Sequence, residues 1–211
     1  MRIPFRFSLV IASLAFLLSA CSESFTDPRD GHSYDVVKIG NLSWMAENLN
    51  YATEMSVCPD GDSRNCKRLG RLYSWAEAKT VCPEGWRLPT SADFAQILAQ
   101  SLDGNPGAVS NEAGAKLKSR DGWFKKGNGT DEFGFNALPA GYRGAISKSD
   151  DGTISGGKFD GIGGYAYFWS ATEDPENPES NAYYLFLAFN SKSASVNSFS
   201  KNDLRSVRCV R

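Results

Sequence analysis

The chain has 211 residues, of which 23 are Lys or Arg and 24 are Asp or Glu, so its formal net charge is −1. Charges of both signs are interspersed without long runs. This pattern predicts an ordinary solvated surface and excludes the basic stripe that is typical of nucleic-acid-binding proteins. The length and the 41% of hydrophobic residues are enough to bury one core, so we expect a single domain.

Residues 1–20 are typical of a secretory signal peptide. Arg2 and Arg6 precede an apolar run, FSLVIASLAFLLSA, that is too short to span a bilayer comfortably. The run leads into LSAC, which ends at Cys21 and resembles the lipobox of bacterial lipoproteins, where the cysteine is diacylated and becomes the new N-terminus. We therefore expect Cys21 to carry a lipid anchor, because two acyl chains hold a protein stably on a membrane.

The stretch 21–29 is short and polar, and we expect it to be a tether that leads into one domain over residues 30–211. Ser22 follows the lipidated cysteine at a position where an aspartate would favour the inner membrane in some bacteria. The expected location is therefore the bacterial cell envelope, with the outer membrane favoured and the lipid as the contact with the membrane.

Four further cysteines are expected to form two disulfides, because an exported chain folds where disulfides persist. Of the connectivities that four cysteines allow, we favour Cys58–Cys66, which brackets the turn-rich loop CPDGDSRNC. The other pair, Cys82–Cys209, would close a loop of 127 residues, worth roughly 4 to 5 kcal/mol in the chain-entropy model. Zinc is disfavoured because the chain has a single histidine and no Cys-x-x-Cys spacing.

The first half of the domain predicts a hairpin and two helices. Aromatic and β-branched residues flank Gly40-Asn41, which is a hairpin signal. The stretch 72–82, LYSWAEAKTVC, has apolar or small residues at helical spacing. A second helix is expected after Pro89, with Thr90 or Ser91 as its cap. Its apolar face would consist of Phe94, Ile97, Leu98 and Leu102.

After residue 103 the sequence predicts short strands separated by long loops. Asp151-Gly152 and Asp160-Gly161 are typical of turns. The strand candidates are FGFNALPAGYRG, GYAYFWSAT, AYYLFLAFN, ASVNSFS and RSVRCVR. The expected fold class is α+β, with two helices packed on short antiparallel strands, long loops and disulfide staples.

Five motifs, in this order along the chain, resemble the Fibrobacter succinogenes major paralogous domain, a family found on secreted and lipid-anchored bacterial proteins. They are TDPRDGHSYDVVKIGNLSWMAENLNY, CPEGWRLPT, GFNALPAGYR, YFWSAT and SVRCVR, and the resemblance covers residues from about 26 to 211. More distantly, SWAEAKTVCPEGWRLPTSADF and RCVR resemble segments of C-type lectin-like domains. The resemblance implies a C-type lectin-like fold, in which the first-helix cysteine pairs with the last-strand cysteine. It implies no activity, because the family has no assigned chemistry.

Three classes of function are open. The first is a non-catalytic surface module that binds carbohydrate or a cell-surface partner, and the second is a structural lipoprotein that assembles by shape. The third is an enzyme similar to the formylglycine-generating enzymes, because RCVR also resembles the last strand of those enzymes. Those enzymes need a reactive cysteine pair near the C-terminus, where this chain has only Cys209. The remaining acids and bases form no recognisable catalytic constellation, so we expect no enzyme, no cofactor and no nucleic acid as a partner.

The ligand face is expected in the loops over residues 141–164 and 172–181, because loops on rigid scaffolds commonly carry function. The candidate ligand-binding residues are Arg143, Asp160, Glu173 and Asp174. Nearby aromatic residues could stack on a ligand or belong to the core, namely Tyr142, Tyr165, Tyr167 and Trp169.

Calcium is a weaker alternative for the acidic loop near residue 175. Its oxygen-bearing side chains suit this ion, and the candidates are Glu173, Asp174, Glu176 and Asn177. The lectin signature Glu-Pro-Asn occurs here only in scrambled order, at Glu176-Asn177-Pro178. We therefore expect no metal and keep calcium as the alternative.

Overall fold

The computed structural model describes residues 23–100, 112–151 and 153–211. The expected signal peptide and the expected lipid anchor at Cys21 lie outside the described residues, as do Leu102 and Gly152. In the described part of the chain, no helix combines the length and the apolar character needed to cross a membrane.

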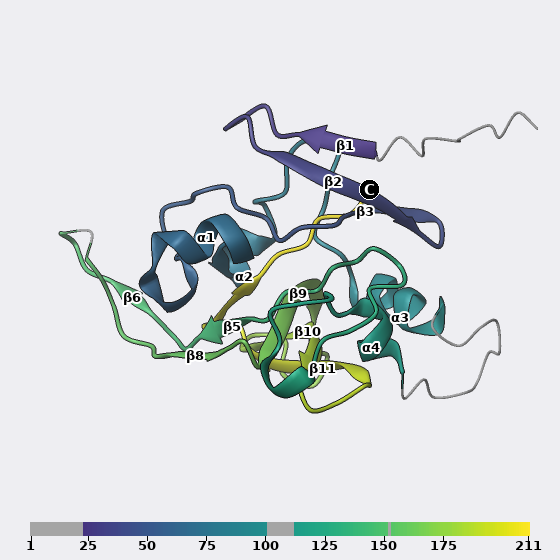
Figure 1. Ribbon diagram of the computed structural model, residues 1–211. Coiled ribbons are helices and arrows are strands. Elements are labelled where there is room, and N and C mark those ends of the chain that lie inside the picture. Colours follow the sequence, from purple (N-terminus) through teal and green to yellow (C-terminus); the bar gives the residue numbers. More distant parts are fainter. Residues whose placement is uncertain (1–22, 101–111, 152) are drawn as a thin grey trace, which may run out of the picture.

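The described part of the chain forms three sheets (Figure 1). The small sheet contains β1 (Glu23–Thr26), β2 (Ser33–Ile39) and β3 (Leu42–Met45). The large sheet has the order β11-β10-β9-β12-β5-β8, with β4 beside β12. Its strands are β4 (Leu72–Ser74), β5 (Ala140–Arg143), β8 (Phe159–Ile162), β9 (Tyr165–Glu173), β10 (Asn181–Ala188), β11 (Ala194–Ser200) and β12 (Leu204–Ser206). A projecting hairpin forms the third, with β6 (Ser147–Lys148) and β7 (Ile154–Ser155).

Short helices connect and cover these sheets. The α-helices of the described residues are α1 (Ser63–Leu69), α2 (Trp75–Ala78), α3 (Ser91–Gln100) and α4 (Ala113–Leu117). The turns η1 (Pro59–Gly61) and η2 (Phe124–Lys126) are 3-10 helices. The chain is thus a mixed α and β protein, as the sequence predicts. Most strand pairs are antiparallel, as expected, but β9 pairs in parallel with both β12 and β5.

Several local predictions are confirmed. Gly40 and Asn41 form the turn between β2 and β3. Each of the five strand candidates overlaps a strand of the large sheet, although in RSVRCVR only Arg205 and Ser206 belong to one. Helix α3 begins after Thr90, whose hydroxyl accepts a hydrogen bond from the backbone N–H of Asp93 at 3.2 Å, as an N-cap does. Phe94 and Ile97 on its apolar face are buried.

The expected helix over 72–82 is mostly wrong. Leu72 to Ser74 form strand β4, and only Trp75 to Ala78 are helical. The cause is tertiary pairing, since β4 lies antiparallel to β12 with Leu72 opposite Ser206 and Ser74 opposite Leu204. Ser74 then caps α2 by accepting a hydrogen bond from the N–H of Glu77.

Two other expectations need correction. Asp160-Gly161 lies inside strand β8, where the backbone pairs with β5, and the turn comes instead at Gly163 and Gly164. The stretch expected to be a tether contains strand β1, so only the part ahead of Glu23 remains for that role. Phe25 holds β1 against the domain, because its ring centroid lies 5.3 Å from that of Trp86.

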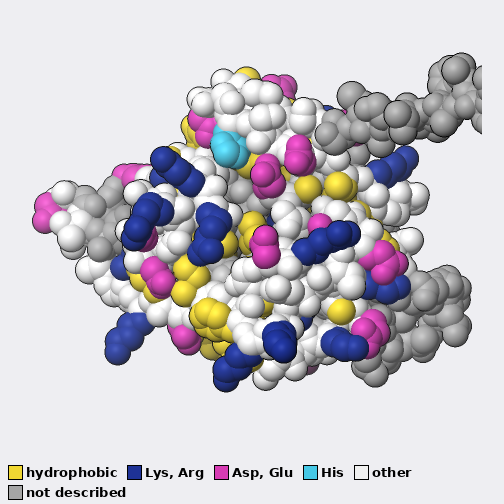
Figure 2. Space-filling model, viewed as in Figure 1, with side chains coloured by type: hydrophobic (Ala, Val, Ile, Leu, Met, Phe, Trp, Pro, Cys, Tyr) yellow, Lys and Arg dark blue, Asp and Glu magenta, His cyan; other side chains and the backbone are white. Residues whose placement is uncertain are grey.

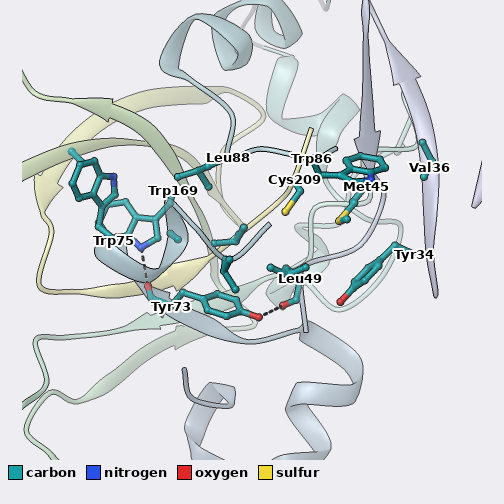
Figure 3. Close-up of a cluster of buried hydrophobic side chains, with 14 residues drawn as sticks. Tyr34, Val36, Met45, Leu49, Tyr73, Trp75, Trp86, Leu88, Trp169 and Cys209 are labelled. Atoms are coloured by element: carbon teal, nitrogen blue, oxygen red, sulfur yellow. Dashed lines mark hydrogen bonds between the residues drawn. The ribbon is translucent and has the colours of Figure 1, made fainter. Parts of the chain in front are cut away.

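The disulfides are Cys58–Cys66 and Cys82–Cys209, as predicted. Cys209 is fully buried in a core cluster that joins the small sheet to the large one (Figure 3). In that cluster the indole N–H of Trp169 donates to the carbonyl of Tyr73 at 2.9 Å, and the Tyr73 hydroxyl donates to the carbonyl of Leu49 at 3.2 Å. These bonds satisfy polar groups that burial would otherwise leave unpaired.

Candidate ligand site on the outer face of the large sheet

The two faces of strands β9 and β10 have different surroundings. Ala166 and Phe168 of β9, with Leu185 and Leu187 of β10, point into the core beneath α3. The alternate positions face outward, and in an antiparallel pair such positions are commonly polar. Four of these positions, Tyr165, Tyr167, Tyr184 and Phe186, are aromatic and only half-buried. Exposed apolar surface of this kind makes the face a candidate for contact with a ligand.

The outward rings form a continuous row, which we call the aromatic strip. Tyr167 contacts both Tyr184 and Phe186, with ring centroids 5.7 and 5.1 Å apart. Tyr165 stacks on Phe186 at 5.8 Å and meets Phe189 edge-on at 6.1 Å. Each ring is thus held by at least one other, so the strip is an ordered surface.

One end of the strip opens into a hollow of about 150 Å³, which we call the aromatic hollow. Its walls come from five strands, β5, β9, β10, β11 and β12, and from the turn before β12. Its lining residues are Tyr142, Tyr167, Tyr184, Phe199, Asp203 and Arg205. Phe199 is 56% exposed, although it is a large apolar side chain. The hollow is smaller than the roughly 300–1,000 Å³ pockets that enclose drug-sized ligands, and suits one ring or one side chain.

A buried ion pair forms the floor of the aromatic hollow. Arg205 is 2% exposed and donates from Nη2 to Oδ2 of Asp203 at 2.9 Å. Its guanidinium carbon lies 3.9 Å from the ring centre of Tyr184 and 4.6 Å from that of Trp169. Such stacking stabilises a cation by about 0.5 to 2 kcal/mol. The aromatic rings and Asp203 therefore fix the guanidinium in place.

Several polar atoms at this site have no partner in the described part of the chain. The Nε and Nη1 groups of Arg205 are buried without a hydrogen bond. The hydroxyl groups of Tyr142, Tyr167 and Tyr184 make none with any described residue. Burial raises the pKa of Tyr167, so this hydroxyl stays protonated at neutral pH and can donate. The tyrosine hydroxyls are accessible to a ligand in the hollow, whereas the two Arg205 groups are buried beneath its surface.

The four ligand-binding residues expected from the sequence do not form one site. Arg143 and Asp160 lie on the β5–β8 pair, where Arg143 stacks on Phe159 at 4.9 Å and donates to the carbonyl of Gly156. Glu173 and Asp174 lie at the far end of β9. None of the four lines the aromatic hollow.

The acidic loop after β9 uses its carboxylates within the protein. Glu173 forms an ion pair with Lys201 at 2.8 Å. Asp174 accepts hydrogen bonds from the Ser198 hydroxyl at 2.7 Å and from the backbone N–H of Glu176 at 3.0 Å. Among the described residues, no three His, Cys, Asp or Glu side chains gather as metal ligands would. The carboxylates of Glu173 and Asp174 are thus both engaged by protein groups.

The aromatic candidates divide between the two roles that the sequence leaves open. Tyr142 and Tyr167 line the aromatic hollow, and Tyr165 belongs to the strip. Trp169 is fully buried and belongs to the core. Four lining residues are not predicted from the sequence, namely Tyr184, Phe199, Asp203 and Arg205. The available signal was the outward aromatic alternation of YAYFW and AYYLF, but no local pattern points to Asp203 or Arg205.

A model of the Fibrobacter succinogenes major domain family matches residues 37–211. The chain belongs to this family. No curated protein and no solved structure matches the chain. The match begins within β2 and covers both disulfides and the whole aromatic hollow.

Two motifs of this Fibrobacter succinogenes major domain have structural roles. In CPEGWRLPT, Arg87 and Thr90 both hydrogen-bond the carboxylate of Asp93 at the start of α3. In SVRCVR, Arg208 is fully buried and donates to the carbonyl of Met45 at 3.2 Å and to the carbonyl of Phe135. Burial lowers the pKa of Arg208 to about 9, so its guanidinium stays charged at neutral pH. These arginines tie segments together and lie outside the hollow.

The surface charge of the domain has no single sign. On the face shown in Figure 2, Lys and Arg side chains alternate with Asp and Glu side chains. The chain as a whole is nearly neutral. The face shown therefore carries no broad field of one charge.

Proposed function

We propose that this domain is a non-catalytic module that binds carbohydrate, with one sugar ring held in the aromatic hollow. The observation that carries the proposal is the ring of tyrosines, with unpaired hydroxyls, around the buried Arg205–Asp203 pair. Sugar rings have apolar C–H faces and a rim of hydroxyl groups. The hollow offers aromatic faces for the first and hydrogen-bonding groups for the second.

Charge in the aromatic hollow favours a neutral ring there. Arg205 and Asp203 neutralise one another, so a strongly charged group gains little attraction and loses its hydration. Asp203 would accept hydrogen bonds from sugar hydroxyls, and the tyrosine hydroxyls can both donate and accept. Because no metal ligand enters this account, we expect binding to be unaffected when calcium is chelated.

We also propose the finer fold and location that the sequence suggests. The C-type lectin-like fold is supported by the bond from Cys82, ahead of α3, to Cys209 beyond β12. The location is proposed to be the bacterial cell envelope, through a lipid on Cys21, and rests on the sequence LSAC. A module on a lipid tether would hold the domain where polysaccharides are exposed.

The proposal is tested by titrating the purified full chain with soluble oligosaccharides made from glucose, xylose, mannose or uronate, followed by calorimetry. Tyr184→Ala removes the ring that stacks on Arg205, and we expect it to weaken binding about tenfold or more, since ring stacking is worth roughly 1 to 3 kcal/mol. Asp203→Asn should weaken binding as well. The matched control is Tyr183→Ala, on the same strand but outside the hollow.

Thermal unfolding of each variant separates lost binding from lost folding. Two results would contradict the proposal: no oligosaccharide binds the folded wild-type chain at millimolar concentration, or Tyr184→Ala binds as tightly as Tyr183→Ala. Repeating the titration with a calcium chelator checks the metal independence.

A further inference from the structure

A second hollow lies at the other end of the aromatic strip. Its volume is about 380 Å³, and its lining includes Phe189 of the strip. Lys118, Lys126 and Lys192 also line it, so we call it the lysine hollow. This hollow is larger than the aromatic hollow, and lysine, asparagine, serine and threonine side chains line it in place of tyrosines. We therefore expect the two hollows to bind different parts of a ligand.

The lysine hollow carries an excess of positive charge. Lys118 is 2% exposed, and its ammonium donates to the carbonyls of Ala188 and Ser191 at 3.2 and 2.8 Å. No carboxylate of the described residues pairs with Lys118 or Lys126. Lys192 pairs with Glu112 at 3.3 Å, and this is the acidic residue in the lining. The balance favours an anionic group, attracted more strongly where the protein excludes water.

The wall between the strip and the lysine hollow is tightly packed. A Cβ atom on Gly127 would lie 2.3 Å from the carbonyl oxygen of Phe189, so only glycine lets the two segments approach this closely. Phe124 and Phe189 both lie against Gly164. Phe124 is 55% exposed, much as Phe199 is at the opposite end. The two most exposed large apolar side chains described thus stand at the two ends of one aromatic surface.

The distance between the hollows sets the size of a ligand that reaches both. Tyr184 lines the aromatic hollow and Phe189 lines the lysine hollow, five positions further along the chain. At about 3.3 Å per residue in an extended strand, this separation is roughly 17 Å. A linear chain of several sugar rings spans that length, whereas a single ring does not.

We infer that the ligand is a linear acidic oligosaccharide or polysaccharide that lies along the aromatic strip. One ring occupies the aromatic hollow, the following rings stack on Phe186 and Tyr165, and an anionic substituent enters the lysine hollow. This inference rests on the proposed function and adds the length and charge of the ligand to it. A lysine ammonium group is a point charge and lacks the planar, bidentate hydrogen-bond geometry of an arginine guanidinium. Carboxylate and sulfate are therefore both suitable anions.

The test is a chain-length series on the full chain, using uronate oligosaccharides, sulfated galactan oligosaccharides and neutral glucose oligosaccharides of one to six rings. We expect affinity for one of the acidic series to rise about tenfold or more between one ring and four rings, and then to level off. Neutral chains of equal length should bind more weakly. The better acidic series identifies the anion as carboxylate or sulfate.

Lys126→Gln and Lys192→Gln should each reduce the affinity for long acidic chains about threefold to tenfold, and should reduce its dependence on salt. Neither should change binding of short neutral sugars. Lys158→Gln is the control, because this exposed lysine lines neither hollow.

The inference is overturned if affinity does not depend on chain length, or if acidic and neutral chains of four rings bind equally and the lysine variants match Lys158→Gln. In either case Tyr184→Ala still reports on the aromatic hollow. A loss of short-sugar binding in that variant would leave the proposed function standing while the longer, acidic ligand is rejected. Absence of all sugar binding would reject both.

Discussion

Asp93 is the residue that fixes the start of helix α3. Its carboxylate accepts from the backbone N–H of Thr90 at 2.7 Å and from the Thr90 hydroxyl at 2.8 Å, while its own N–H donates to that hydroxyl. Arg87 adds two hydrogen bonds, at 2.6 and 3.2 Å. This reciprocal arrangement is a capping box reinforced by an arginine, and it explains the spacing of the WRLPTSAD motif.

Stability should depend on pH through Asp93. Desolvation raises its pKa, but the hydrogen bonds from Arg87 and Thr90 outweigh this, and the folded pKa lies below the usual value. The stabilisation is therefore present above about pH 4, the unfolded pKa, and is lost as pH falls through the folded pKa. We expect Asp93→Asn to lower the free energy of unfolding by about 1 kcal/mol at pH 7 and by less near pH 2.

Urea unfolding at the two pH values measures this difference. Asp35→Asn, at an exposed position of β2, serves as the control and should change neither value. An equal loss for Asp93→Asn at both pH values would show that the carboxylate charge has no part in the cap.

At the level of elements, strand β5 is the junction that brings Tyr142 into the aromatic hollow. It pairs with β8 on one side and touches β9 and β12 on the other. Gly141 makes this crowding possible, because its φ is +66° and a Cβ there would lie 2.3 Å from the carbonyl oxygen of Asp160. An L-residue at this position would be strained and would also clash with β8.

Gly141→Ala should therefore lower the free energy of unfolding by about 1 to 3 kcal/mol or more. It should also weaken sugar binding, since Tyr142 is the next residue. Gly144→Ala is a matched control at the end of the same strand, where the nearest atom to a new Cβ would be 3.6 Å away. Urea unfolding and sugar titration of both variants check the prediction, and equal stability of the two would refute it.

Across the whole molecule, the last five residues connect parts that are distant in sequence. Ser43 of β3 exchanges two backbone hydrogen bonds with Arg211, and Arg87 exchanges two with Val210. The disulfide from Cys209 to Cys82 fixes this segment covalently. The C-terminal segment thus holds the small sheet against the large one, as Figure 1 shows beside β3.

The two disulfides should differ in their contribution to stability. Cys58–Cys66 has a sequence separation of 8 and Cys82–Cys209 one of 127. The chain-entropy model rates the longer loop about 2 kcal/mol more stabilising than the shorter one. We expect the variant with alanine at positions 82 and 209 to unfold at lower urea concentration than the variant with alanine at positions 58 and 66. Cys209 and Cys82 also pack in the main core cluster, so the loss of packing in the first variant adds to the difference in the same direction. Equal midpoints would show that loop length does not govern stability here.

The sequence by itself determined the features that local signals encode. Gly40-Asn41 set the first hairpin, Thr90 set the start of α3, and period-two alternation marked β9 and β10. The cysteine spacing indicated both disulfides. Each of these features depends on residues that are close in sequence or on the entropy of closing a loop. Both kinds of signal can be recognised without knowledge of the packed fold.

Only the tertiary structure decided the rest. Residues 72–74 have a helical pattern but form a strand, because β12 offers them backbone partners that local propensity does not anticipate. The aromatic hollow likewise depends on contacts such as Tyr142 with Tyr167 and Tyr184 with Arg205. These residues come from strands whose order in the sheet does not follow the chain, so their meeting is fixed by strand order and register. Strand order and register are set by the need to bury apolar area and to pair backbone groups over the whole molecule. A short stretch of sequence does not contain the information needed to satisfy both requirements.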